Sequence, residues 1–137
     1  MPAEFVLRRI GVVRSSLTDR KGAPRQGYEG APEASVEVQA ELMRGLDGIK
    51  AGDDIVLLTW LHEGQRDVLE VRPRKDPRNP LTGVFATRSP DRPNPIGLHR
   101  VTVTRIEGAR LDVRPLEVID GTPVVDIKPV LDQSNDG

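Results

Sequence analysis

The chain has 137 residues, which suits one domain with a single hydrophobic core. Hydrophobic residues make up 36% of it and aromatic residues only 3%, so the core should consist of Val, Leu and Ile, a composition that favours a sheet over a helix bundle. The lack of cysteine excludes disulfides, zinc–thiolate sites and thiol catalysis, and two histidines are too few for a multi-histidine metal site.

The net charge of −1 hides an uneven distribution. Residues 66–105 carry nine Lys or Arg against four Asp or Glu, a balance of +5, and the rest of the chain carries 11 against 17, a balance of −6. This asymmetry favours an anionic partner on one region, although a sheet face covered with solvated charges has the same pattern. Because no signal-like segment and no apolar run of about 18 residues is present, we expect a soluble, cytoplasmic protein that does not bind membranes.

Short segments with strand-like alternation or apolar runs recur along the chain, at residues 5–13, 35–40, 55–61, 67–72, 83–87, 98–106, 111–114 and 118–128. About eight strands with almost no helix predict a mainly β fold, a small antiparallel barrel or sheet in a single domain. This domain should cover residues 1–130, followed by a polar tail at 131–137. Residues 41–46 read as one or two helical turns. Residues 15–33, rich in Gly and Pro, read as a long loop of the kind that is usually functional or disordered.

The most unusual stretch is residues 83–98, which begins as an apolar strand and then becomes polar and stiff. Three prolines within six residues fix the backbone and force extended geometry on the residues before them. The resulting loop should display Arg88, Arg92 and Asn94 in fixed directions, an arrangement suited to a planar anion or a nucleotide. A solvated surface turn is the alternative.

Other candidate residues are weaker when taken singly. His62, where the 55–61 strand ends, could bind a ligand or shuttle a proton, but a structural role is the more frequent one. Asp120 and Asp126 flank a tight turn at 121–123, in which Asp120 is expected to bond its own backbone. Two carboxylates without a third ligand make a poor magnesium site.

Residues 83–98 resemble the TsaA-like family, the TrmO-type tRNA methyltransferases. Four further segments match that family in order and extend the match over nearly the whole chain: residues 10–15, 24–27, 57–62 and 120–129. The resemblance implies a small β-barrel, a homodimer and S-adenosyl-L-methionine (SAM) as cofactor. It also implies tRNA as partner, with the methyl group going to N6 of threonylcarbamoyladenosine beside the anticodon.

The resemblance assigns roles by position. It places ten residues at the cofactor, namely Arg25, Gln26, Gly27, His62, Glu63, Arg88, Leu116, Glu117, Val118 and Ile119, the last four largely through their backbone. On the substrate side it places Arg92, Asn94, Asp126 and Lys128, of which Arg92 or Lys128 could pair with the threonyl carboxylate. It assigns no catalytic residue and no metal.

Two departures from the family pattern concern tRNA binding more than cofactor binding. Residues 72–75 read Arg-Pro-Arg-Lys where the family has Arg-Pro-Pro-Arg, and His99 replaces a small polar residue. Two alternatives therefore stay open beside the tRNA methyltransferase. One is a SAM-binding module without catalysis, and the other is a methyltransferase for a small metabolite, whose turnover would depend only mildly on salt.

Overall fold

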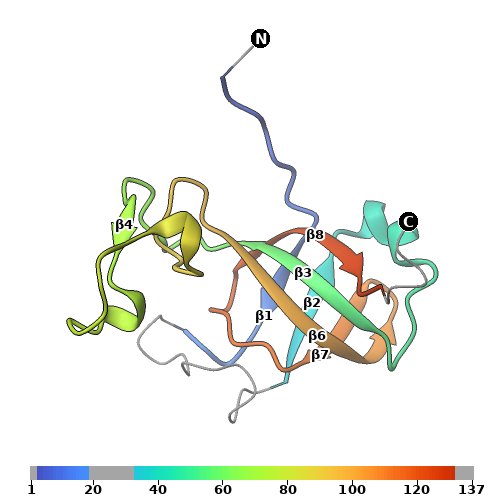
Figure 1. Ribbon diagram of the computed structural model, residues 1–137. Coiled ribbons are helices and arrows are strands. Elements are labelled where there is room, and N and C mark those ends of the chain that lie inside the picture. Colours follow the sequence, from blue (N-terminus) through green and yellow to red (C-terminus); the bar gives the residue numbers. More distant parts are fainter. Residues whose placement is uncertain (1–2, 19–32, 132–137) are drawn as a thin grey trace.

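The computed structural model describes residues 3–18 and 33–131, which form a closed six-stranded antiparallel barrel (Figure 1). Its strands are β1 (Gly11–Arg14), β2 (Ala34–Val38), β3 (Asp54–Trp60), β6 (Ile96–Glu107), β7 (Arg110–Arg114) and β8 (Pro123–Pro129). Around the barrel they follow the order β1-β2-β7-β6-β3-β8, and β8 pairs with β1 to close the ring. The predicted mainly β, single-domain barrel is confirmed.

The core consists of the side chains that alternate strand positions direct into the barrel. On β3, Ile55 and Leu57 are buried while the residues between them are partly exposed. On β6, Val101 and Val103 occupy the inward positions. Closure leaves no free edge in the barrel sheet, and the interior is filled mainly by Val, Leu and Ile side chains.

β6 is the longest strand and links two neighbours. Its first half pairs with β3 and its second half with β7, and the register shifts between Val103 and Arg105. A tight turn joins β6 to β7, and Glu107 pairs with Arg110 across it. Gly108 lies in this turn with a φ of 58°, which is a conformation that glycine adopts without a steric penalty.

Outside the barrel, residues 70–83 form a projection that we call the basic arm. It consists of β4 (Glu70–Val71), the 3-10 helix η3 (Pro73–Lys75) and β5 (Thr82–Gly83), and β4 pairs with β5. A 3-10 helix, η2 (Ala40–Leu46), lies at the other end of the barrel (Figure 1). It confirms the helical turns expected at residues 41–46. Within the described residues no α-helix occurs, and no helix is long and apolar enough to cross a membrane.

Several predicted strands are shorter than the alternation indicated, because a strand needs a partner. The segment expected at 5–13 becomes a strand only at Gly11, where the ladders to β2 and β8 begin. The segment at 67–72 pairs only over Glu70–Val71, and the segment at 118–128 pairs only from Pro123 onward. The segment at 83–87 was predicted wrongly as a strand, since Val84–Ala86 is the 3-10 helix η4. Residues 19–32 and 132–137, and so most of the predicted loop and tail, lie outside the described residues.

Candidate functional site

The proline-stiffened loop is fastened to the residues that follow β3. The backbone N–H of Leu61 donates to the carbonyl of Pro95 at 2.7 Å, and that of Arg92 donates to the carbonyl of Gln65 at 2.9 Å. The N–H of Gln65 in turn donates to the carboxylate of Asp91 at 2.9 Å. These bonds hold residues 61–65 and 90–95 together at one end of the barrel.

Arg92 braces the same loop from within. Its guanidinium donates to the carbonyl oxygens of Val84, Thr87 and Ser89 at distances of 2.7 to 3.1 Å. These carbonyls lie in η4 and the following turn and take no part in a strand ladder, and that of Val84 also accepts from the N–H and the hydroxyl of Thr87. Arg92 therefore has a structural function that the sequence did not indicate, and a substrate carboxylate would have to compete for its donors.

The two fastened loops enclose a cavity of about 390 Å³. This volume falls within the range of roughly 300–1,000 Å³ in which small-molecule sites lie. Six residues predicted to hold the cofactor line it together: His62, Glu63, Arg88, Glu117, Val118 and Ile119. They come from three separate parts of the chain, so the fold brings together residues that only the family resemblance had connected.

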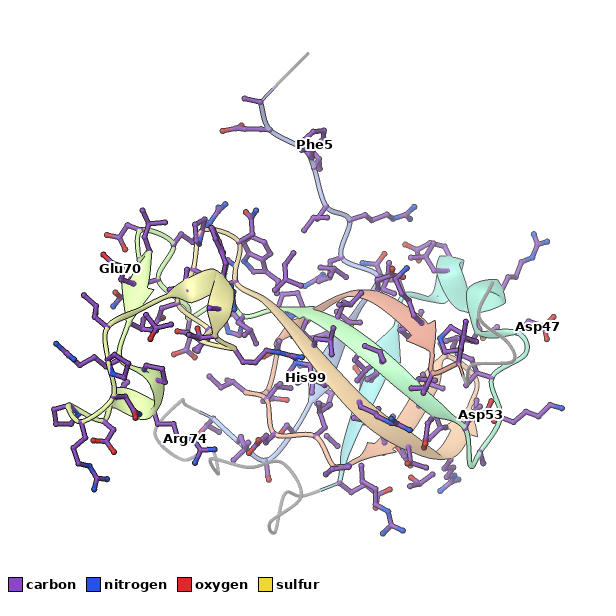
Figure 2. The ribbon with its side chains drawn as sticks, viewed as in Figure 1. Phe5, Asp47, Asp53, Glu70, Arg74 and His99 are labelled. Atoms are coloured by element: carbon purple, nitrogen blue, oxygen red, sulfur yellow. The ribbon has the colours of Figure 1, made fainter. Side chains whose placement is uncertain are left out.

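His99 also lines this cavity, although it is not among the predicted site residues. Its Nε2 lies 2.8 Å from Oγ1 of Thr59, in hydrogen-bond contact across β3 and β6 (Figure 2 labels His99). Burial lowers the pKa of His99 to about 4, so the imidazole is neutral at physiological pH. The alternation of β6 could have predicted this position, because residue 99 lies on the same inward face as Val101 and Val103.

Gly97 makes room for this hydrogen bond. A Cβ atom there would lie 2.6 Å from Oγ1 of Thr59 and 2.7 Å from Nε2 of His99. Both distances are far inside van der Waals contact, so a larger residue would displace the pair. The glycine of the 83–98 motif thus shapes the cavity wall as well as leading into the strand.

Glu117 is the second unusual group in the cavity. Among the residues that the structure describes, none is a hydrogen-bond partner of its buried Oε2, and burial raises the pKa of this carboxyl. A desolvated, unpaired carboxylate oxygen is costly in an empty protein. Glu117 therefore offers an acceptor to a ligand that carries a cation or hydroxyl groups, and it does so through its side chain and not only through the expected backbone.

The remaining predicted residues lie elsewhere. Arg25, Gln26 and Gly27 fall outside the described residues. Leu116 is buried in the barrel core. Asn94 accepts a hydrogen bond from Arg66 at 3.1 Å, and Arg66 also lies over the ring of Trp60 at 5.1 Å.

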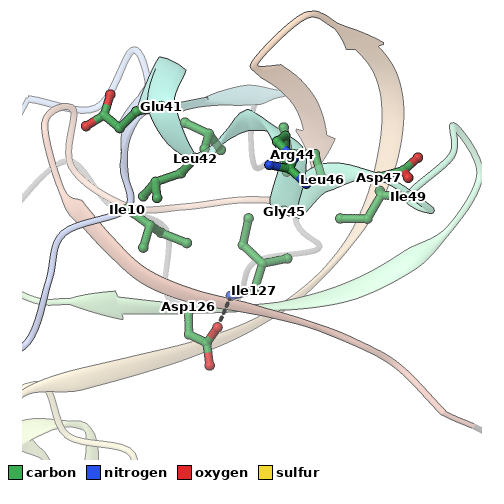
Figure 3. A pocket seen from close by; sticks show the side chains of 11 residues that line it. Ile10, Glu41, Leu42, Arg44, Gly45, Leu46, Asp47, Ile49, Asp126 and Ile127 are labelled. Atoms are coloured by element: carbon green, nitrogen blue, oxygen red, sulfur yellow. Dashed lines mark hydrogen bonds between the residues drawn. The ribbon is translucent and has the colours of Figure 1, made fainter.

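Asp126 and Lys128 form an ion pair on β8, with Nζ of Lys128 3.1 Å from Oδ2 of Asp126. Asp126 borders a different and larger cavity of about 800 Å³ between η2 and β8, where its carboxylate points away from η2 (Figure 3). This second cavity is lined mainly by aliphatic residues and by none of the predicted cofactor residues. The smaller cavity is the one that brings the predicted cofactor residues together, so we take it as the candidate site.

Two further expectations concern carboxylates. The prediction that Asp120 bonds its own backbone was wrong, because its Oδ1 accepts from the N–H of Ser15 at 3.0 Å and its N–H donates to the carbonyl of Leu17. Asp120 thereby ties the start of the long loop to the segment that lines the cavity. Among residues 3–18 and 33–131, no group of three His, Asp or Glu side chains could hold a metal ion.

The fold agrees with comparisons to known proteins. A family model described as the tRNA-methyltransferase O N-terminal domain matches residues 12–136. A "Probable S-adenosyl-L-methionine-binding protein" of Methanothermobacter thermautotrophicus is 42% identical over 126 residues, covering 92% of this chain and 90% of the relative. An "S-adenosyl-L-methionine-binding protein" of Archaeoglobus fulgidus is 42% identical over 124 residues, covering 90% and 88% of the two chains.

Solved structures lead to the same family. The crystal structure of TrmO from Pseudomonas aeruginosa superposes with a TM-score of 0.76 and 28% identity over 98% of this chain. Another TrmO crystal structure gives a TM-score of 0.75 and 32% identity over 93% of this chain. The chain spans 59% and 58% of those two proteins, and 33% of another A. fulgidus relative.

Fold, cavity and relatives define a β-barrel protein of a SAM-binding methyltransferase class. The chain belongs to the family of the tRNA-methyltransferase O N-terminal domain, which confirms the family predicted from its sequence. The predicted cofactor, SAM, is the one in the names of the relatives.

Proposed function

We propose that this protein binds SAM in the 390 Å³ cavity and transfers its methyl group to N6 of threonylcarbamoyladenosine beside the anticodon of tRNA. The observation that carries the proposal is the convergence of Arg88, Glu117 and His99 on one cavity. Support for the RNA substrate comes from the family name and from the excess of basic residues between 66 and 105. Action on tRNA would place the protein in the cytoplasm.

The cavity fits SAM in its charges. SAM carries a carboxylate, an ammonium group, ribose hydroxyls and a sulfonium cation. Arg88 has no ion pair among the described residues and can take the carboxylate, and the unpaired Oε2 of Glu117 can accept from the ammonium group or a hydroxyl. A neutral His99 does not repel the sulfonium.

When bound, SAM supplies a methyl group that its sulfonium has already activated. The remaining task of the protein is to hold donor and acceptor in line and to keep water out, which the fastened loops and the rigid strands suit. The acceptor nitrogen of the substrate is urea-like and a weak nucleophile, so a nearby hydrogen-bond acceptor would assist transfer. We assign no residue to that step.

We further propose that the protein acts as a homodimer. Phe5 and Leu7 are exposed on the segment before β1, and together with Trp60 and Ile96 they line a cavity of about 720 Å³. Apolar side chains gathered around a hollow on the surface are typical of subunit contacts. Analytical ultracentrifugation should give twice the monomer mass of 15.1 kDa, and a monomer at micromolar concentration would contradict the dimer.

The experiment that tests the function uses labelled SAM and two tRNA pools, one carrying threonylcarbamoyladenosine and one lacking it. Label on the modified pool alone supports the proposal. The names of the relatives mention binding only, which favours a non-catalytic SAM-binding module as the second candidate. That candidate predicts SAM binding by calorimetry with no label on either pool, and a metabolite enzyme predicts the same result here.

A further inference from the structure

The nine basic residues between 66 and 105 are not equivalent once their partners are known. Six of them have partners inside the protein: Arg66, Arg72, Arg78, Arg92, Arg100 and Arg105. Arg78 pairs with Asp76 at 2.8 Å, and Arg100 and Arg105 pair with Asp54 and Glu107. Among the described residues, the three cations of this region without an ion pair or side-chain hydrogen bond are Arg74, Lys75 and Arg88.

Arg88 belongs to the cavity already described, whereas Arg74 and Lys75 stand together on the basic arm. Both are exposed, and Figure 2 shows Arg74 on the arm, outside the barrel. Both have positive φ angles, 59° and 54°, which are uncommon for residues other than glycine. Two such residues in succession turn the chain sharply at the point where the two free cations lie.

The arm holds this turn in place by its own hydrogen bonds. Arg72 donates to the carbonyl of Asn79 at 2.8 Å, and the amide of Asn79 donates to the carbonyl of Pro73 at 2.7 Å. The N–H of Lys75 donates to the carbonyl of Arg72 at 2.9 Å. The braced loop therefore presents Arg74 and Lys75 on a backbone that has little conformational entropy left to lose on binding.

The arm also connects directly to the candidate site. Its second strand, β5, continues into η4 and then into Arg88, and the N–H of Val84 donates to the carbonyl of Leu69 at 2.9 Å, which ties both ends of the arm together. An anionic polymer that brings one unit to the mouth of the cavity would thus meet a cationic contact on the segment that leads into it.

We propose that Arg74 and Lys75 form a phosphate-binding contact for the RNA whose modified nucleotide meets the methyl donor at the mouth of the cavity. This inference rests on the RNA substrate proposed above and adds the surface that holds it. Two positive charges close together and free of internal partners suit backbone phosphates, which contribute affinity and position without reading sequence.

The test measures binding of a fluorescein-labelled tRNA to the full chain by anisotropy over a salt series. Each lost phosphate contact lowers the slope of log affinity against log salt by about 0.7 to 0.9. Arg74→Gln/Lys75→Gln should therefore lower the slope by roughly 1.5 and weaken binding at least about fivefold near physiological salt. The matched control is Arg100→Gln/Arg105→Gln, which removes two similarly exposed charges that already have partners and should retain most of the affinity.

Equal losses of tRNA affinity in the two double variants would show that only the overall charge matters, and this would overturn the proposal. So would unchanged binding in the arm variant, or a wild-type protein that binds no tRNA. If polyglutamate displaced the labelled tRNA as effectively as unlabelled tRNA does, the arm would instead be assigned to an acidic protein partner. Should the glutamine variant misfold, Arg74→Gly/Lys75→Gly removes the same charges while suiting the positive φ angles, and it should show the same loss.

SAM binding by calorimetry should be the same in wild type and in all three variants, since the arm lies outside the cavity. Measuring tRNA binding and methyl transfer on the same variants separates the arm proposal from the proposed function. If the wild type binds tRNA through the arm but transfers no methyl group, the proposed function fails and the arm inference stands. If methyl transfer proceeds without any dependence on Arg74 and Lys75, the reverse holds.

Discussion

His99 and Thr59 meet across the β6–β3 ladder, with Nε2 of the imidazole 2.8 Å from the threonine hydroxyl, at the wall of the cavity that we assign to SAM. Thr59 is fully buried, and Gly97 lies directly opposite it in the register. The pair therefore joins the barrel core to the candidate site, and changes made there should affect both stability and ligand binding.

Gly97→Ala should damage this junction. The new methyl group would collide with both partners of the hydrogen bond, and overpacking of this kind costs about 1–3 kcal/mol. Denaturant unfolding should show that loss, and calorimetry should show weaker SAM binding. Gly83→Ala is the control, because a Cβ there meets no atom within 4 Å and its φ is negative. Equal stability of the two variants would contradict the crowding that we describe.

His99 should make stability fall in mild acid. Its folded-state pKa of about 4 lies below the ordinary value of about 6.5 expected in the unfolded chain, so between these pH values the unfolded chain binds the extra proton. The contribution of neutral His99 to the free energy of unfolding is complete above pH 6.5. It declines as the pH drops toward 4, by about 3 kcal/mol at most. Unfolding free energies measured at pH 7 and pH 4.5 should therefore differ more in wild type than in His99→Gln. Equal differences would show that this histidine is not buried as described.

Glu117→Gln should separate ligand binding from stability. Burial raises the pKa of Glu117, so its charged form is penalised in the folded state at neutral pH. Removing the charge should leave the ligand-free protein as stable as wild type or slightly more stable. Affinity for SAM should fall about tenfold, since a charged acceptor for a cationic ligand is lost. Calorimetry that gives wild-type affinity would remove Glu117 from the site.

Arg92→Lys should lower stability, because one ammonium group cannot satisfy three carbonyl oxygens in the geometry of the guanidinium fork. We expect a loss of about 1–3 kcal/mol in the free energy of unfolding. A role limited to the substrate carboxylate, as expected from the sequence, predicts instead an unchanged unfolding midpoint with a raised KM for the modified tRNA. Thermal unfolding together with kinetics distinguishes the two roles.

The sequence predicted the barrel well because alternation reports which residues face a core, and most paired strands fall within or near the predicted segments. It failed at Val84–Ala86, where an apolar run has no neighbouring strand and folds as a 3-10 turn. Hydrogen bonds between particular backbone and side-chain groups leave no pattern in the sequence. The contact of Arg92 with Val84, eight residues away, was therefore missed, as was that of Asp120 with the distant Ser15. His99 could have been found from the alternation of its strand.

The candidate site, too, was only partly predictable from the sequence. Its members came from family resemblance, since His62, Arg88 and Glu117 share no spacing rule that connects them. What the structure adds is their convergence on one cavity and the chemical state of two of its groups. The functional hypothesis therefore depends most on whether this cavity, and not the larger one near η2, binds the cofactor.

Titration of SAM into two arginine variants by calorimetry tests that point most directly. Arg88→Gln removes a cation that lines the smaller cavity, and Arg44→Gln removes one that lines the larger cavity. We expect Arg88→Gln to weaken SAM binding at least about tenfold, as loss of a charge-assisted pair with a carboxylate should, and Arg44→Gln to bind like wild type. Wild-type affinity in Arg88→Gln together with a loss in Arg44→Gln would place the cofactor at the other end of the barrel and contradict the account.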